Sequence, residues 1–178
     1  MALDLGGLLS KYLNLPAGQQ APDAEDHFDQ VAQHAPPEVL GQGISDALRS
    51  DSTPPLGQMV SDVYAKAEPH EQAGMLNQIL GSLGPGVLSS LGGGALGGLL
   101  GQLGGQLAGG GAPRITPQQA SQISPQQVQD LANHAEQHDS GIFDKLGSFY
   151  AQNPQLVKTL GTAALTIAMA NIAGRMKR

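Results

Sequence analysis

The chain has 178 residues, of which 40% are hydrophobic and only 3% aromatic, and it contains no cysteine. This length suits one compact domain or two small ones, and the lack of cysteine excludes disulfides, thiolate catalysis and cysteine-based zinc sites. The net charge of −6 is uneven: residues 1–71 carry eleven acids against three bases, and residues 72–178 carry four acids against six bases. An acidic body repels phosphate, so no nucleic-acid partner is expected.

Residues that cap helices, each followed by proline, mark where helices are expected to begin. Proline is favoured in a first helical turn because the N–H that it lacks would have no partner there. No alternating strand pattern and no Asn-Gly or Asp-Gly hairpin turn interrupts the series. The sequence therefore predicts an all-α fold. The capped starts are Thr53-Pro54, Thr116-Pro117, Ser124-Pro125 and Asn153-Pro154.

Residues 1–86 are predicted to form an acidic N-terminal helical bundle. A short helix is expected at about residues 3–13, and residues 23–83 supply four further helices with apolar faces. The clearest amphipathic pattern follows Pro55, where apolar side chains recur at helical spacing. That stripe consists of Leu56, Met59, Val60, Val63, Tyr64 and Ala67.

Residues 87–113 form a central segment that is rich in glycine and leucine. No charged residue occurs from Gln72 to Pro113. The leucines recur at helical spacing and glycine repeats at every fourth position, which predicts a glycine-zipper helix. Glycine destabilises a helix by up to about 1 kcal/mol per residue, so such a helix needs a packed partner or lipid around it. The alternative is a disordered glycine-rich segment. The expected interaction residues are Leu96, Leu99, Leu100, Leu103 and Leu107, with Gly93, Gly97, Gly101 and Gly105.

Residues 114–178 are predicted to form a C-terminal helical unit whose last helix is apolar. The run "TLGTAALTIAMANIAG" covers about 16 residues, or roughly 24 Å as a helix, which is less than the roughly 30 Å hydrocarbon core of a membrane. A buried or interfacial helix is therefore expected in place of a membrane span. Three bases follow it, Arg175, Lys177 and Arg178, and they would suit an anionic membrane surface.

Asp130, His134 and His138 are spaced four residues apart, so they share one face of a predicted helix. Two imidazoles one turn apart can chelate zinc, nickel or copper, which makes these three residues a candidate metal site. The alternative is a solvated surface on which histidines near a helix C-terminus are favoured by the helix dipole.

No cofactor and no enzymatic activity are expected. The glycines at positions 92, 94 and 97 match a dinucleotide fingerprint as a string, but no strand precedes them and no acidic residue follows about 20 positions later. No Gly-x-Ser-x-Gly nucleophile motif occurs either.

The glycine and leucine tract is followed by glutamine-rich helix starts, "ITPQQ" and "ISPQQVQDLA". This arrangement, over at most residues 80–161, resembles the YidB-like group of uncharacterised bacterial helical proteins. The resemblance implies a bacterial origin and an all-α fold, and it transfers no functional residues.

These features lead to one main functional hypothesis and two alternatives. The main hypothesis is a non-catalytic interaction protein that self-associates through the glycine-zipper helix at the cytoplasmic face of a membrane. The first alternative is a monomeric protein-binding module with the glycine helix buried in its core, and the second is a metal-binding protein that uses His134 and His138. The N-terminal residues include Asp4 and no basic region, so no signal peptide is predicted. A cytoplasmic location, peripheral to the inner membrane, is expected.

Overall fold

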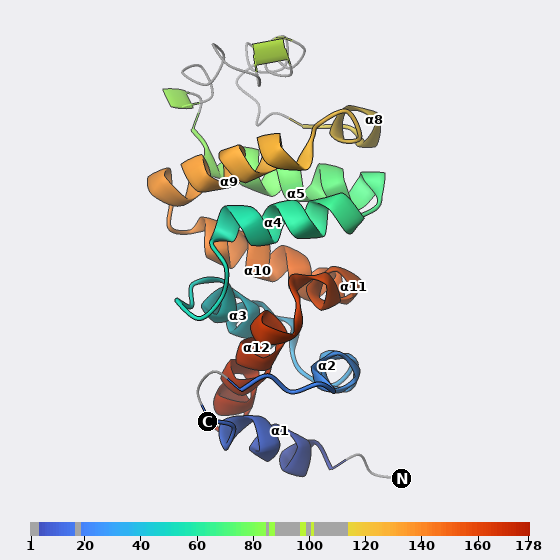
Figure 1. The fold of residues 1–178 in the computed structure, drawn as a ribbon, viewed down its shortest axis with the longest axis vertical. Helices are drawn as coiled ribbons and strands as arrows, with labels where there is room; N and C mark the ends of the chain where they lie inside the picture. Colours follow the sequence, from blue (N-terminus) through green and yellow to red (C-terminus); the bar gives the residue numbers. More distant parts are fainter. Residues whose placement is uncertain (1–3, 17–18, 85, 88–96, 99–100, 102–113) are drawn as a thin grey trace. The chain divides into compact units, whose positions relative to one another are not determined.

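A computed structural model describes residues 4–16, 19–84, 86–87, 97–98, 101 and 114–178. Every regular element in these ranges is helical (Figure 1), which confirms the predicted all-α fold. Contacts between residues divide the chain into two compact units. The first joins residues 1–55 to residues 143–178, and the second comprises residues 56–142. These units do not follow the boundaries at 86 and 113 that composition suggested, since the first unit is built from both ends of the chain.

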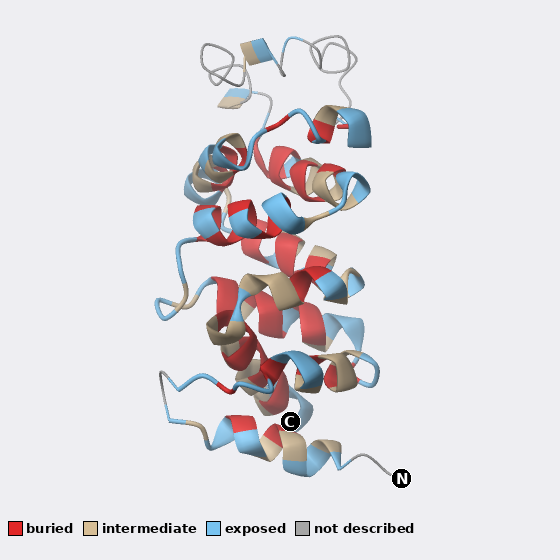
Figure 2. Ribbon diagram, turned by 45° about the vertical axis from the view of Figure 1, so that its right-hand side comes forward, coloured by how far each residue is buried: buried red, intermediate tan, exposed pale blue. Residues whose placement is uncertain are grey.

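The first unit is organised around the last helix, α12. This helix contacts α3, α1 and α2, and its small and aliphatic side chains are buried (Figure 2). The apolar character of this segment is thus explained by its place in the core. The elements are α1 (Leu5–Leu13), α2 (Ala24–Ala32), α3 (Pro37–Leu48), α10 (Ile142–Gln152), α11 (Pro154–Val157), the 3-10 helix η1 (Lys158–Leu160) and α12 (Thr162–Met176).

The second unit is organised around α9. This helix packs against α4 and α5, and the short α8 packs against α5. Its elements are α4 (Leu56–Lys66), α5 (Pro69–Ser82), α8 (Pro117–Ala120) and α9 (Pro125–His138). The amphipathic stripe expected in α4 forms its buried face, since Leu56, Met59, Val60, Val63 and Tyr64 are all at most 2% exposed.

Two of the expected helix starts have complete capping boxes. The hydroxyl of Thr116 accepts a hydrogen bond from the Gln119 N–H, and that of Ser124 accepts one from the Gln127 N–H. In both cases the glutamine side chain accepts a hydrogen bond from the backbone N–H of the capping residue. Each box thus satisfies two N–H groups that the helix itself leaves without partners.

Three helix crossings depend on glycine. A Cβ on Gly41 of α3 would lie 3.4 Å from the Ser148 Cα of α10, and one on Gly43 would lie 3.2 Å from the Ala168 carbonyl oxygen of α12. In the second unit, a Cβ on Gly57 of α4 would lie 2.8 Å from the Gln129 carbonyl oxygen of α9. Neighbouring backbones are therefore close enough at these points to exclude a side chain.

Among the described glycines, Gly161 is the one with a positive φ, at 91°. It precedes α12 and turns the chain from η1 into that helix. Residues with a Cβ rarely adopt this backbone conformation, so the turn requires glycine.

Candidate functional site

The described residues of the predicted glycine zipper are Gly97, Gly98 and Gly101, and all three are helical. Gly97 is half-buried, whereas Gly98 and Gly101 are exposed. A Cβ on Gly98 or Gly101 would have no described atom within 4 Å. The backbone there is open, unlike the backbone at the three glycine crossings. The other predicted interaction residues, Gly93, Leu96, Leu99, Leu100, Gly105, Leu103 and Leu107, lie outside the described residues.

The basic end of α12 is partly used within the chain. Arg175 donates hydrogen bonds to the Asp46 carboxylate at 2.6 Å and to the Gln42 side-chain oxygen at 2.9 Å, both on α3. Lys177 and Arg178 are exposed. None of the described helices is both long and apolar enough to cross a membrane. Contact of this basic end with an anionic membrane stays a prediction.

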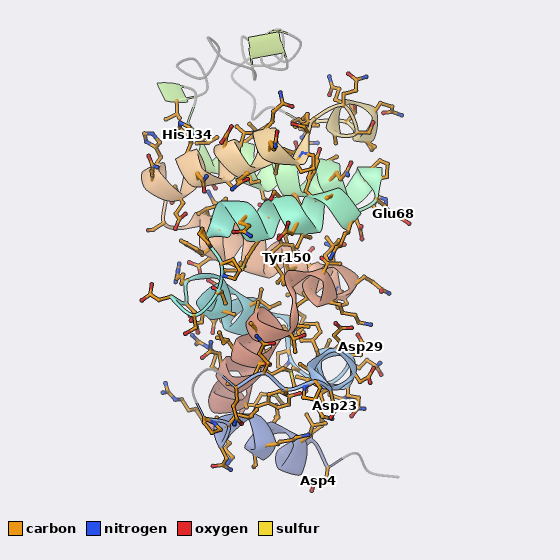
Figure 3. All side chains as sticks on the ribbon, in the orientation of Figure 1. Asp4, Asp23, Asp29, Glu68, His134 and Tyr150 are labelled. Atoms are coloured by element: carbon orange, nitrogen blue, oxygen red, sulfur yellow. The ribbon has the colours of Figure 1, made fainter. Side chains whose placement is uncertain are left out.

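The three residues of the predicted metal site are not brought together. The His134 Nδ1 lies 2.7 Å from the backbone carbonyl oxygen of Asp130, one turn back in α9 (Figure 3). Because a carbonyl can only accept, Nδ1 must carry a proton there. Within the described part of the chain, no group of three or more His, Cys, Asp or Glu side chains is placed to hold a metal ion. A site formed by His134 and His138 alone stays a prediction.

His34 makes the same local contact near the end of α2. Its Nδ1 lies 2.9 Å from the Gln30 carbonyl oxygen, four residues back in the chain. The two histidines occupy matching places in "DQVAQHA" and "QDLANHA". The His34 imidazole thus contacts a carbonyl in the last turn of α2, a position at which histidine is favoured, whereas the Asp130 carbonyl lies in the interior of α9.

The structure adds a site that the sequence analysis missed, a pocket of about 340 Å³ in the first unit. Its lining includes Gly41, which contacts Gly147 where α3 and α10 cross. Two carboxylates, an amide and a hydroxyl line it, from Glu38 and Gln42 of α3 and from Asp144 and Ser148 of α10. Polar side chains from both helices therefore line the pocket.

Two side chains that line the pocket are held by residues outside its lining. The Asp144 carboxylate accepts a hydrogen bond of 2.7 Å from the buried Ser45 hydroxyl and one of 3.0 Å from Arg49. These bonds, that from Ser45 above all, hold the pKa of Asp144 below its usual value, so the carboxyl is ionised at neutral pH. Arg175 orients Gln42 from the other side. Two of the four polar side chains that line the pocket, those of Asp144 and Gln42, are thus held by hydrogen bonds within the chain.

A short sequence repeat explains why α3 and α10 contribute similar side chains to the pocket. Residues 38–42 read "EVLGQ" and residues 144–148 read "DKLGS". In both, the leucine is buried, the glycine lies at the crossing, and the acid and the last polar residue line the pocket. Comparing the two segments could have revealed this pattern from sequence, but their meeting depends on contacts across about 100 residues.

Comparison of the chain with protein-family models, with curated proteins and with solved structures gives no match. The resemblance to the YidB-like group stays a prediction.

Proposed function

We propose that the protein is a non-catalytic helical protein that self-associates through the glycine and leucine tract of residues 87–113. The observation that carries the proposal is the open helical backbone at Gly98 and Gly101. Bare backbone on a helix lets a second helix approach closely, and such packing offsets the low intrinsic helix propensity of glycine.

The glycine crossings elsewhere in the chain support this proposal. At Gly41, Gly43 and Gly57, glycine is in contact with a neighbouring helix of the same chain. Gly41, Gly57 and Gly101 each follow a leucine and precede a glutamine, so the tract repeats the local sequence of a helix crossing. At Gly101 no described residue covers the glycine. A helix from a second copy would supply the missing neighbour.

The alternative in which the glycine helix is buried in the core of a monomer is less well supported. Burial would place other helices of the chain against Gly98 and Gly101, whereas both are exposed. Each unit also has a buried core made by its own helices, for example Ile44 and Leu165 in the first and Val63 and Leu131 in the second.

The double substitution Gly97→Leu and Gly101→Leu tests the proposal. It places two large side chains on the helix face through which a second helix would approach. We expect wild-type protein to have a mass in solution above the 18.3 kDa of one chain, and the variant to shift toward 18.3 kDa. Light scattering coupled to size exclusion measures both.

Gly81→Leu is the matched control, because Gly81 is also an exposed helical glycine with no described atom near its Cβ position. It should leave the mass unchanged, and circular dichroism should show the same helix content in all three proteins. An unchanged oligomer in the double variant would overturn the proposal.

A further inference from the structure

We propose that the pocket between α3 and α10 binds a primary ammonium group, such as that of a lysine side chain or a small diamine. The pocket is separate from the glycine tract, and the proposal does not depend on self-association. Its volume of about 340 Å³ falls at the lower end of the range of small-ligand sites.

The charges around the pocket favour a single positive charge. Three carboxylates, those of Glu38, Asp46 and Asp144, lie in or next to it, and two arginines accompany them. Arg49 pairs with Asp144, and Arg175 pairs with Asp46. Glu38 has no hydrogen bond or ion pair within the described residues, so one negative charge is left without a counterpart.

The hydrogen-bonding groups of the pocket match an ammonium group. An ammonium donates up to three hydrogen bonds and accepts none. Glu38 can accept from it, and each oxygen of Asp144 has a further lone pair beyond those used by Ser45 and Arg49. The Ser148 hydroxyl supplies another acceptor. Oxygen atoms on both helices would therefore accept the hydrogen bonds of the ammonium group.

A divalent metal ion fits the pocket less well. Its preferred environment is several oxygen ligands with a higher negative charge, whereas the described residues contain no three-ligand group placed to hold a metal. The oxygen of Gln42 is also occupied by Arg175. The geometry thus favours a single organic ammonium group, which carries one positive charge.

Nuclear magnetic resonance titration of the full chain tests the proposal. The probes are 1,5-diaminopentane and Nα-acetyl-lysine amide, with 1,5-pentanediol as the neutral match and Ca²⁺ as the metal. Because both carboxylates are exposed, binding is expected on the order of millimolar. We expect saturable shifts of the amides of Gly41, Gln42 and Ser148 with an amine, and no such shifts with the diol.

Two variants identify the carboxylates involved. Glu38→Gln should weaken amine binding roughly fivefold or more, and Asp144→Asn should weaken it as well. Glu136→Gln, which neutralises an exposed helical carboxylate of the second unit, should leave it unchanged.

The result separates the two sources of the ammonium group. Binding of the lysine amide supports a side chain of a protein partner, and binding of the diamine alone supports a free small molecule. Three outcomes would overturn the proposal: no saturable shift with either amine, equal binding by the diol, or displacement of the amine by Ca²⁺ at lower concentration.

Discussion

At the scale of single residues, two buried tyrosines show how differently a hydroxyl can be accommodated. The Tyr64 hydroxyl donates a hydrogen bond to the Ala120 carbonyl in the second unit. The Tyr150 hydroxyl, on α10 in the first unit (Figure 3), is buried with no hydrogen-bond partner. Burial raises the pKa of Tyr64 to about 12 and raises that of Tyr150 further, so both side chains are neutral at physiological pH. Of the two buried hydroxyls, that of Tyr64 makes a hydrogen bond and that of Tyr150 does not.

This difference predicts opposite effects of removing the two hydroxyls. Tyr150→Phe should raise the free energy of unfolding by about 1 kcal/mol, because an unsatisfied buried hydroxyl is removed. Tyr64→Phe should lower it by about 1 kcal/mol, because the hydrogen bond to the Ala120 carbonyl is lost, while that carbonyl keeps the one that it accepts from the Ile123 N–H. Urea unfolding of both variants measures the two values. A larger loss for Tyr150→Phe than for Tyr64→Phe would contradict this account.

Local signals were enough to predict many features at this scale. The Thr116 and Ser124 caps follow from residue type and the glutamine three positions later, because both partners lie within one helical turn. The contact of His134 with a carbonyl of its own helix is local too. The lack of a partner for Tyr150 was not predictable, since it depends on which distant helices surround the ring.

At the scale of helices, two groups of described glycines have contrasting surroundings. Those at crossings, such as Gly41 and Gly147, touch a neighbouring backbone, whereas Gly81, Gly98 and Gly101 have no described atom near their Cβ positions. Glycine therefore permits close packing of helices at the crossings, whereas at the open positions it only lowers helix propensity.

The two groups should respond in opposite ways to alanine. A Cβ on Gly147 would clash with the Gly41 carbonyl oxygen and lie 3.1 Å from the Ser45 nitrogen, so Gly147→Ala should destabilise the protein by about 1 to 3 kcal/mol. Gly81→Ala should stabilise it by up to about 1 kcal/mol, because alanine favours the helix and meets open space. Thermal unfolding of the two variants gives the comparison. Equal effects of the two substitutions would show that the glycine crossings are not constrained.

Apolar periodicity predicted the helices well, and the stripe of α4 is buried as expected. The crossings were not predicted, because periodicity describes which face of a helix is apolar and not where two helices approach. A glycine within an amphipathic helix was the available signal, and it is present at Gly41, Gly57 and Gly147.

At the scale of the whole molecule, opposite charges from distant parts of the chain meet in the first unit. Lys158 pairs with Asp29 at 2.5 Å (Figure 3 labels Asp29), and Arg175 pairs with Asp46 at 2.6 Å. The acidic N-terminal segment and the more basic C-terminal segment thus pair in a folded unit. Composition showed the charge asymmetry but not its consequence, since the pairing requires residues 143–178 to fold onto residues 1–55.

Acid should weaken the first unit through Asp144. Its folded-state pKa is lowered, mainly by the Ser45 hydrogen bond, below the usual value of about 3.9 that applies in the unfolded chain. The stabilisation is therefore fully present above pH 4 and is lost as the pH falls through the folded-state pKa. We expect Asp144→Asn to be less stable than wild type at pH 7 and to lose less stability on acidification. Urea unfolding between pH 7 and pH 2.5 measures this, and parallel pH profiles of the two proteins would contradict it.

We propose that the glycine and leucine tract joins copies of this chain. Sedimentation equilibrium of the wild-type protein in detergent-free buffer, over a hundredfold range of concentration, tests it most directly. We expect a mass that rises with concentration toward a fixed multiple of 18.3 kDa. A mass of 18.3 kDa at every concentration would contradict it.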